Sequence, residues 1–79
     1  MSILPGYADR VGPKLAFDKV AELVGAPSSP ENDKDLKIVV QGLCASYPGF
    51  DETAKAVDEV KAKRPDIAAQ VLQPAQAPS

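Results

Sequence analysis

Apolar side chains recur with a helical period along three stretches of this chain, and residues that start or stop helices bound each stretch. Over residues 13–24 the apolar positions project onto one face at about 100° per residue, and most charged positions project onto the other. Pro13 suits the first position of a helix, and Gly25 suits a left-handed cap at its end. The pattern therefore predicts a helix over 13–24. Its expected buried face consists of Ala16, Phe17, Val20, Ala21, Leu23 and Val24.

The densest apolar run predicts a second helix, over residues 30–46. Ser29 is a suitable N-cap, Pro30 suits the first helical position, and acidic residues follow near the positive end of the helix dipole. The β-branched residues would also fit a short strand over 36–41. We favour the helix because the helical period continues as far as Tyr47. Its expected main apolar face consists of Leu36, Val39, Val40, Leu43, Cys44 and Tyr47.

Ile38, Gly42 and Ala45 form a smaller second face on the same helix. A helix that is apolar on more than one side is either buried at the centre of a bundle or shared with a partner. A glycine on such a face allows another backbone to approach closely. We therefore expect this face to contact the N-terminal arm, a C-terminal helix or another chain.

A Pro-Gly pair after Tyr47 interrupts the helical pattern, and a third, more polar helix is predicted over 51–63. We expect Phe50 to pack against this helix as a staple residue and Asp51 to act as its N-cap. The helix carries only a narrow apolar stripe, and oppositely charged residues four positions apart suit an exposed surface.

Prolines delimit the remaining segments. A proline after the third helix opens a short fourth helix over 65–72, and a further proline ends it. Residues 1–12 show no helical period and are predicted to form an extended arm, and residues 73–79 form a Pro/Ala tail. The predicted fold is all-α, in one domain covering 1–79. It is a small bundle of three helices (about 13–24, 30–46 and 51–63) plus a short fourth.

The composition limits which functions such a domain can perform. The chain has 79 residues, a net charge of −2, one cysteine and no histidine. A core this small often needs oligomerisation or a partner for its stability. The negative charge provides no general attraction to nucleic acid or anionic lipid. Spanning a bilayer takes about 20 consecutive apolar residues, and no stretch of the sequence is that long. The absence of histidine removes the commonest general base and metal ligand.

Candidate chemistry is sparse. Cys44 is the only thiol, no histidine is present to activate it, and its place on an apolar helix face indicates a core residue. The acidic residues lie at helix starts and on helix faces, and their spacing lacks the glycine and glutamate of a calcium loop. The basic residues of 61–64 have acidic neighbours and no interleaved aromatic residues, so we attribute them to the helix dipole. We expect no catalytic residue, no cofactor, no metal site and no enzyme activity.

Several apolar residues fall outside the predicted core faces, and exposed apolar groups mark protein contacts when they lie together. The sequence therefore predicts a non-enzymatic structural or accessory subunit of a larger protein assembly. A minor or decoration protein of a bacteriophage-type virion and an accessory subunit of an organelle complex both fit. The alternative is a small helical regulator that binds a protein partner or, less readily, nucleic acid. The residues expected to bind a partner are Ile3, Leu4, Tyr7, Leu15, Ile38, Gly42 and Ala45.

The first ten residues lack the basic start and apolar run typical of a signal peptide. A single cysteine cannot form an internal disulfide, which is the usual staple of small secreted domains. We therefore expect a soluble protein of a reducing compartment such as the cytoplasm, or one incorporated in a virion or other large particle. Its expected partners are other protein chains, in a homo- or hetero-oligomeric context, without a membrane span.

Overall fold

Five α-helices make up the fold in the computed structural model, which describes residues 3–72. In chain order they are α1 (Tyr7–Val11), α2 (Pro13–Gly25), α3 (Pro30–Ser46), α4 (Asp51–Lys63) and α5 (Pro65–Val71). The described residues contain no strand, so the predicted all-α bundle is confirmed and residues 36–41 are helical. The predicted Pro/Ala tail, 73–79, lies outside the described residues.

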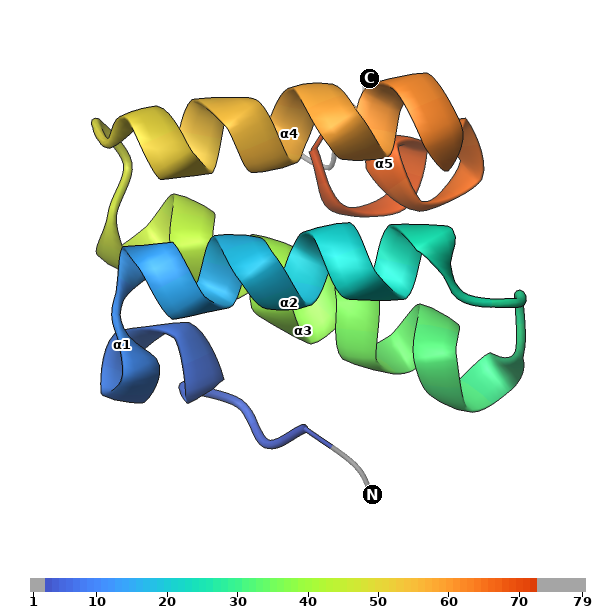
Figure 1. Ribbon diagram of the computed structural model, residues 1–79, viewed down its shortest axis with the longest axis horizontal. Helices are drawn as coiled ribbons and strands as arrows, with labels where there is room; N and C mark the ends of the chain where they lie inside the picture. Colours follow the sequence, from blue (N-terminus) through green and yellow to red (C-terminus); the bar gives the residue numbers. More distant parts are fainter. Residues whose placement is uncertain (1–2, 73–79) are drawn as a thin grey trace, which may run out of the picture.

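The three long helices form the bundle, and the two short ones cover it. α2 and α4 lie side by side and run in the same direction, while α3 runs back in the opposite direction (Figure 1). α1 packs against α2 and α3 where α2 begins, and α5 folds back against α3 and α4 where α4 ends (Figure 1). None of the helices within residues 3–72 is both long enough and apolar enough to cross a membrane.

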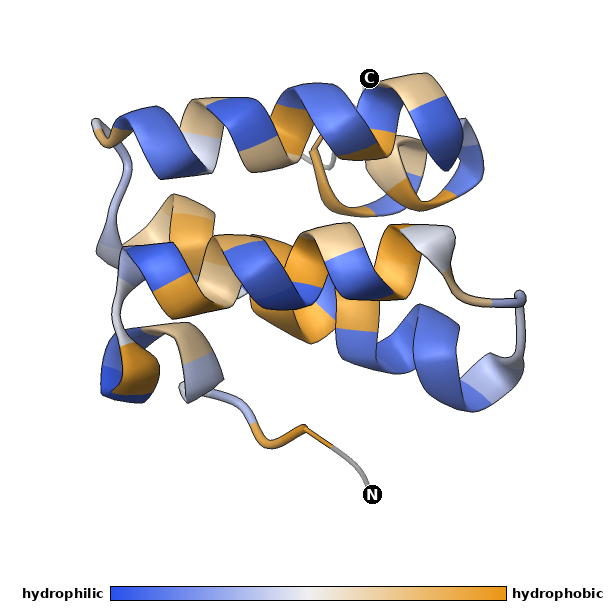
Figure 2. Ribbon diagram, in the orientation of Figure 1, coloured by the Kyte–Doolittle hydropathy of each residue, from blue (hydrophilic) through white to orange (hydrophobic). Residues whose placement is uncertain are grey.

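The core is built around α3, as its dense apolar run predicts. Figure 2 shows apolar residues on the sides of the long helices that face one another, and hydrophilic residues over the outer side of α4 and the start of α3. Fully burying one large aliphatic side chain contributes about 1.5–3 kcal/mol, so a few such residues decide the stability of a domain this small. The largest fully buried side chains are Leu36, Leu43, Ile67, Val20, Val39, Val40 and Val60.

The end of α2 differs from the sequence prediction at two positions. Ala21, expected on the buried face, is exposed, because the face that meets α3 and α4 is narrower than the apolar stripe. Gly25 does not adopt a left-handed conformation but is the last helical residue. Ala26 follows it in an extended conformation, with φ −83° and ψ 160°, and leads the chain directly toward α3. The left-handed cap predicted for Gly25 is therefore wrong.

The starts of α3 and α4 are stabilised in different ways. Ser29 caps α3 as predicted, because its Oγ accepts a hydrogen bond of 3.1 Å from the backbone N–H of Asn32. The prediction that Asp51 caps α4 is wrong, since Phe50 occupies the N-cap position and makes no side-chain cap bond. Phe50 is also 48% exposed, so it does not pack as a buried staple. A Thr53 hydroxyl bond to the preceding loop stabilises this corner instead, with 2.6 Å between Oγ1 and the carbonyl oxygen of Tyr47.

The predicted extended arm over 1–12 is also wrong in part, because Tyr7–Val11 forms the short helix α1. Glycines with positive φ bound this helix on both sides, Gly6 with φ 88° and Gly12 with φ 94°. Five residues are too few to show a helical period in the sequence and too few to form a stable helix in isolation. Packing against α2 and α3 therefore holds α1 in its helical form.

Candidate protein-interaction surfaces

The N-terminal segment, residues 3–11, docks on α3 through a buried carboxylate. The backbone N–H of Ile3 donates a hydrogen bond of 3.0 Å to Oδ1 of Asp35, which is only 5% exposed. Hydrogen bonds to charged groups contribute more than neutral ones, about 1.5–3 kcal/mol each. The sequence interpretation assigned Asp35 to the helix dipole and missed this contact. The sequence did indicate that Asp35 could be buried, because Asp35 lies one helical turn before Val39 and therefore on the buried side of α3.

A second contact of the N-terminal segment lies at Gly42. A methyl group placed at Gly42 would lie 3.0 Å from the side-chain carbon of Ala8, closer than ordinary van der Waals contact. Ala8 is fully buried, so α1 has no free space on this side. The element that approaches the backbone at Gly42 is therefore α1 of the same chain.

Tyr47 connects three elements where α3 ends. Its hydroxyl donates a hydrogen bond of 3.3 Å to the backbone carbonyl of Asp9 in α1. Its own carbonyl accepts the Thr53 bond at the start of α4. The ring of Phe50 meets the Tyr47 ring edge to face, with 5.1 Å between centroids and 75° between planes. These contacts fix the position of Phe50 while leaving about half of its surface in solvent.

The residues predicted to bind a partner have different environments in the structure. Ile3 and Tyr7 are half-buried against the chain's own core, and Gly42 is covered by α1. Ile38 is half-buried and Ala45 is exposed. Leu4 and Leu15 are 61% and 55% exposed. The structure therefore brings Ile3, Tyr7 and Gly42 into the intramolecular docking of the N-terminal segment and does not gather all seven residues on one surface.

An exposed apolar pair lies at the end of the bundle where α2 and α4 begin. Leu15 is in the first turn of α2 and is 55% exposed, and Phe50 directly precedes α4 and is 48% exposed. Both helices start at this end and run side by side from it (Figure 1). We call Leu15 and Phe50 the apolar end. Sequence reasoning found Leu15, which falls among charged positions of its helix, but it missed Phe50 because the residue resembles a buried staple.

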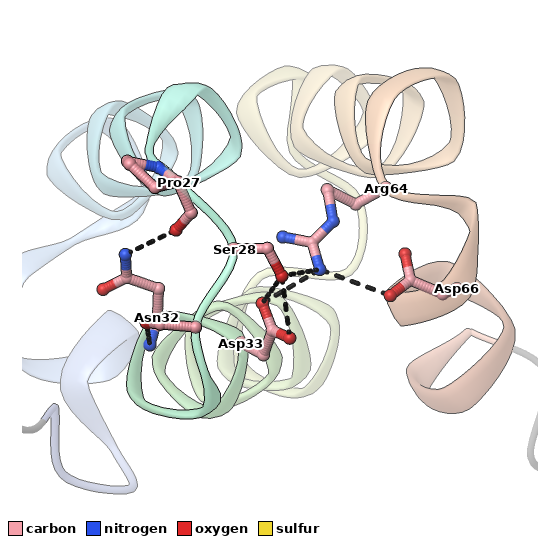
Figure 3. Close-up of polar contacts among 7 residues, drawn as sticks. Pro27, Ser28, Asn32, Asp33, Arg64 and Asp66 are labelled. Carbon is pink, nitrogen blue, oxygen red and sulfur yellow. Dashed lines mark hydrogen bonds and ion pairs between the residues drawn. The ribbon is translucent and has the colours of Figure 1, made fainter.

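The opposite end of the bundle is held by charged side chains around Arg64, the residue between α4 and α5 (Figure 3). The Arg64 Nη2 atom lies 2.9 Å from Oδ1 of Asp33 in α3 and 3.2 Å from Oδ2 of Asp66 in α5. The same nitrogen lies 3.4 Å from Oγ of Ser28 in the loop before α3. Asn32 completes this corner by donating a 2.9 Å hydrogen bond to the carbonyl of Pro27. These contacts join the loop before α3, α3, the α4–α5 joint and α5.

The charges at this corner influence one another's protonation. Hydrogen bonds to Asp33 and Asp66 raise the pKa of the Arg64 guanidinium further above neutral pH. The hydrogen bond from Arg64 lowers the pKa of the Asp66 carboxyl below its ordinary value. Arg64 and Asp66 therefore stay charged at neutral pH, and neither is poised to transfer a proton. The corner is suited to joining helices, not to acid–base chemistry.

The remaining candidates for chemistry offer no reactive set. Burial raises the pKa of the half-buried Cys44 thiol, so the thiol is protonated at neutral pH and packs beside the core. Within residues 3–72, no three Cys, Asp or Glu side chains gather closely enough to hold a metal ion. A hollow of about 210 Å³ lies beside α5, and Lys61 is the only charged residue among the described residues that line it. Its lining consists of Lys61, Pro65, Ala68, Ala69 and Leu72.

Comparisons of the chain with protein-family models, with curated proteins and with solved structures give no significant match.

Proposed function

We propose that this chain is a small non-enzymatic subunit that acts through protein–protein contacts, with the apolar end as its contact surface. The observation that carries the proposal is the difference between the two ends of the bundle. At one end, Arg64 forms ion pairs with Asp33 and Asp66 of the same chain. At the other end, Leu15 and Phe50 each leave about half of their surface in water.

Covering the apolar end would contribute a useful amount of binding energy. Full burial of a Leu or Phe side chain contributes about 1.5–3 kcal/mol, so covering the exposed half of each contributes about 1 kcal/mol. Leu15 and Phe50 together supply about 2 kcal/mol, or roughly a 30-fold change in dissociation constant. The Phe50 ring is already fixed by Tyr47, and a fixed aromatic side chain loses little conformational entropy on binding.

The internal pairing of the basic cluster favours a protein partner over nucleic acid. Arg64 pairs with Asp33 and Asp66, and the Lys63 ammonium lies 3.2 Å from a carboxylate oxygen of Glu59. Binding to a phosphate backbone depends on basic groups that release counterions. Two of the three basic residues over 61–64 are thus already compensated within the chain.

Affinity purification of tagged full-length protein from its own source tests the proposal. The double variant Leu15→Gln/Phe50→Gln is compared with wild type, and Leu4→Gln serves as the matched control because Leu4 is also exposed but lies outside the apolar end. We expect wild type and Leu4→Gln to retain the same stoichiometric protein partner. The double variant should bind that partner roughly 30-fold more weakly, with an unchanged thermal unfolding curve.

Two results would contradict the proposal. One is a double variant that retains wild-type affinity for the partner. The other is a wild-type chain that elutes from gentle lysates of its source as a free monomer.

A further inference from the structure

The joint between α1 and α2 is a single residue, Gly12, in a conformation that other residues avoid. Its φ of 94° and ψ of 164° lie in a region that is essentially restricted to glycine. Gly12 also serves both helices, because its N–H donates to the carbonyl of Ala8 at 2.9 Å and its carbonyl accepts from the N–H of Ala16 at 3.1 Å. Among the described residues, no heavy atom beyond the two chain neighbours and the adjacent helix backbone lies within 4 Å of where its side chain would be, so the backbone conformation restricts this position.

Pro13 favours a second, extended conformation of Gly12. The residue before a proline favours extended backbone with φ near about −120°. A proline also cannot continue α1 into α2, because it lacks an N–H and its ring clashes with the preceding turn. The conformation observed at Gly12 folds α1 back onto α2 and α3 of the same chain. An extended Gly12 directs the N-terminal segment away from them.

The docking site of the N-terminal segment has specific chemistry. Asp35 accepts from a backbone N–H, Gly42 leaves room for one methyl group, and the Tyr47 hydroxyl binds a backbone carbonyl. Asp35 and Gly42 belong to α3, Tyr47 directly follows it, and their counterparts in the segment lie at Ile3, Ala8 and Asp9. None of these contacts depends on the segment being covalently continuous with that α3.

We propose that the N-terminal segment, residues 3–11, exchanges between two copies of this chain. In the exchanged dimer, the segment of each copy docks on α3 of the other, and Gly12 is the hinge in both. Such a reciprocal exchange has two-fold symmetry and recreates every docking contact, so it leaves neither site empty. Glycine adopts this conformation without strain. A residue other than glycine at position 12 would be strained there, and strain in a short hinge promotes exchange. This proposal is independent of the contact proposed at the apolar end.

The hinge variant Gly12→Ala tests the proposal in the full chain. Alanine is strained in the observed conformation but unstrained in the extended one. We expect the dimer dissociation constant to fall at least tenfold relative to wild type, as measured by light scattering across a concentration series. Gly25→Ala is the matched control, because Gly25 has open space and no positive φ, and its dissociation constant should equal that of wild type.

A second variant and an isotope experiment separate exchange from other forms of dimer. In Gly12→Ala/Gly42→Ala, the added methyl group weakens the docking of Ala8 in either chain, and the dimer dissociation constant should rise relative to Gly12→Ala. In Gly12→Ala mixed from two isotopically labelled batches, nuclear Overhauser contacts between Ala8 and Gly42 should join differently labelled chains.

Several outcomes would overturn the exchange. One is a Gly12→Ala protein that stays monomeric at millimolar concentration. Another is a double variant that dimerises as tightly as Gly12→Ala. The exchange would also be contradicted if Gly25→Ala dimerised as strongly as Gly12→Ala. It would be contradicted as well if Ala8–Gly42 contacts were found only within single chains.

Discussion

α1 and α5 are two short helices that both pack on α3, yet they are attached in opposite ways. Each is joined to a long helix by one residue followed by a proline, Gly12 before α2 and Arg64 after α4. Arg64 has φ −133° and ψ 67°, and its side chain binds Asp33 of α3. Gly12 has no side chain and adopts a glycine-restricted conformation. A side chain therefore locks the joint of α5, whereas only packing holds the joint of α1.

The two short helices also contribute differently to the core. α5 buries Ile67, which is 1% exposed, together with Ala68. α1 fully buries only Ala8, and its larger apolar side chains, Tyr7 and Val11, are half-buried. The free energy of burial scales with apolar area. We therefore expect α5 to belong to the cooperative core, whereas α1 packs on the outside of that core and contributes less to its stability. We expect α1 to open locally at a lower free energy than the bundle unfolds.

The largest expected effect comes from truncating the anchor of α5. Ile67→Ala should lower the free energy of unfolding by about 2–5 kcal/mol, because it leaves a cavity in the core. A domain of this size has roughly 3–5 kcal/mol in total, so much of the variant should be unfolded at room temperature. Urea denaturation monitored by circular dichroism measures the change. Leu15→Ala is the control, since Leu15 is 55% exposed and should cost little.

If Ile67→Ala instead loses only the signal of α5 while the bundle keeps its unfolding midpoint, α5 is not part of the cooperative core. The contrast between the two short helices would then disappear.

A smaller and more local effect is expected from Gly42→Ala. Overpacking costs about 1–3 kcal/mol, while replacing a helical glycine with alanine recovers about 0.5–1 kcal/mol. The net loss should be about 1 kcal/mol, since buried Ala8 cannot turn its methyl group away. Hydrogen exchange should accelerate at Gly12, whose N–H bonds to Ala8, and remain slow in α5.

Ala8→Gly/Gly42→Ala provides the compensating control, because it moves one methyl group across the same contact. Restored protection at Gly12 is expected in this double variant. A single variant that is more stable than wild type, with α1 still protected, would show that Gly42 does not limit the approach of α1.

The smallest effect concerns the charged joint of α5. Arg64→Gln removes the hydrogen bond that lowers the pKa of Asp66, so this pKa should rise toward its ordinary value. In wild type, the lowered pKa of Asp66 in the folded state stabilises the fold at pH values above the unfolded-state pKa of about 3.9. This stability is lost as the pH falls through the folded-state pKa. Arg64→Gln should reduce this acid-side dependence, while the backbone hydrogen bonds from Ile67 and Asp66 remain. Losing the partly exposed Arg64–Asp33 pair should cost about 0.2–1 kcal/mol at neutral pH.

Carbon-detected titration of the Asp66 carboxyl measures the shift, with Lys63→Gln as the control because Lys63 pairs with Glu59 instead. If the pKa of Asp66 were unchanged in Arg64→Gln, the charge contact between Arg64 and Asp66 would not stabilise this joint.

The long helices were predictable because their signals are local. Ser29 and Pro30 start α3 at the residue where the structure begins it, and the prolines at 13 and 65 do the same for α2 and α5. The candidate surfaces were less predictable. Leu15 could be recognised from its place among charged positions, but Phe50 stands where a staple residue is expected, and the local pattern does not reveal its 48% exposure.

The sequence by itself determined the all-α class and the bounds of α3 and α4, because caps, breaks and helical period act over a few neighbouring residues. Only the tertiary structure decided that α1 is a helix, that Asp35 binds the N–H of Ile3, and that Arg64 joins Asp33 to Asp66. The bond between Ile3 and Asp35 spans 32 positions of sequence, and the bond between Arg64 and Asp33 spans 31. Such contacts depend on the packing of the long helices, because nothing in the local sequence brings their partners together.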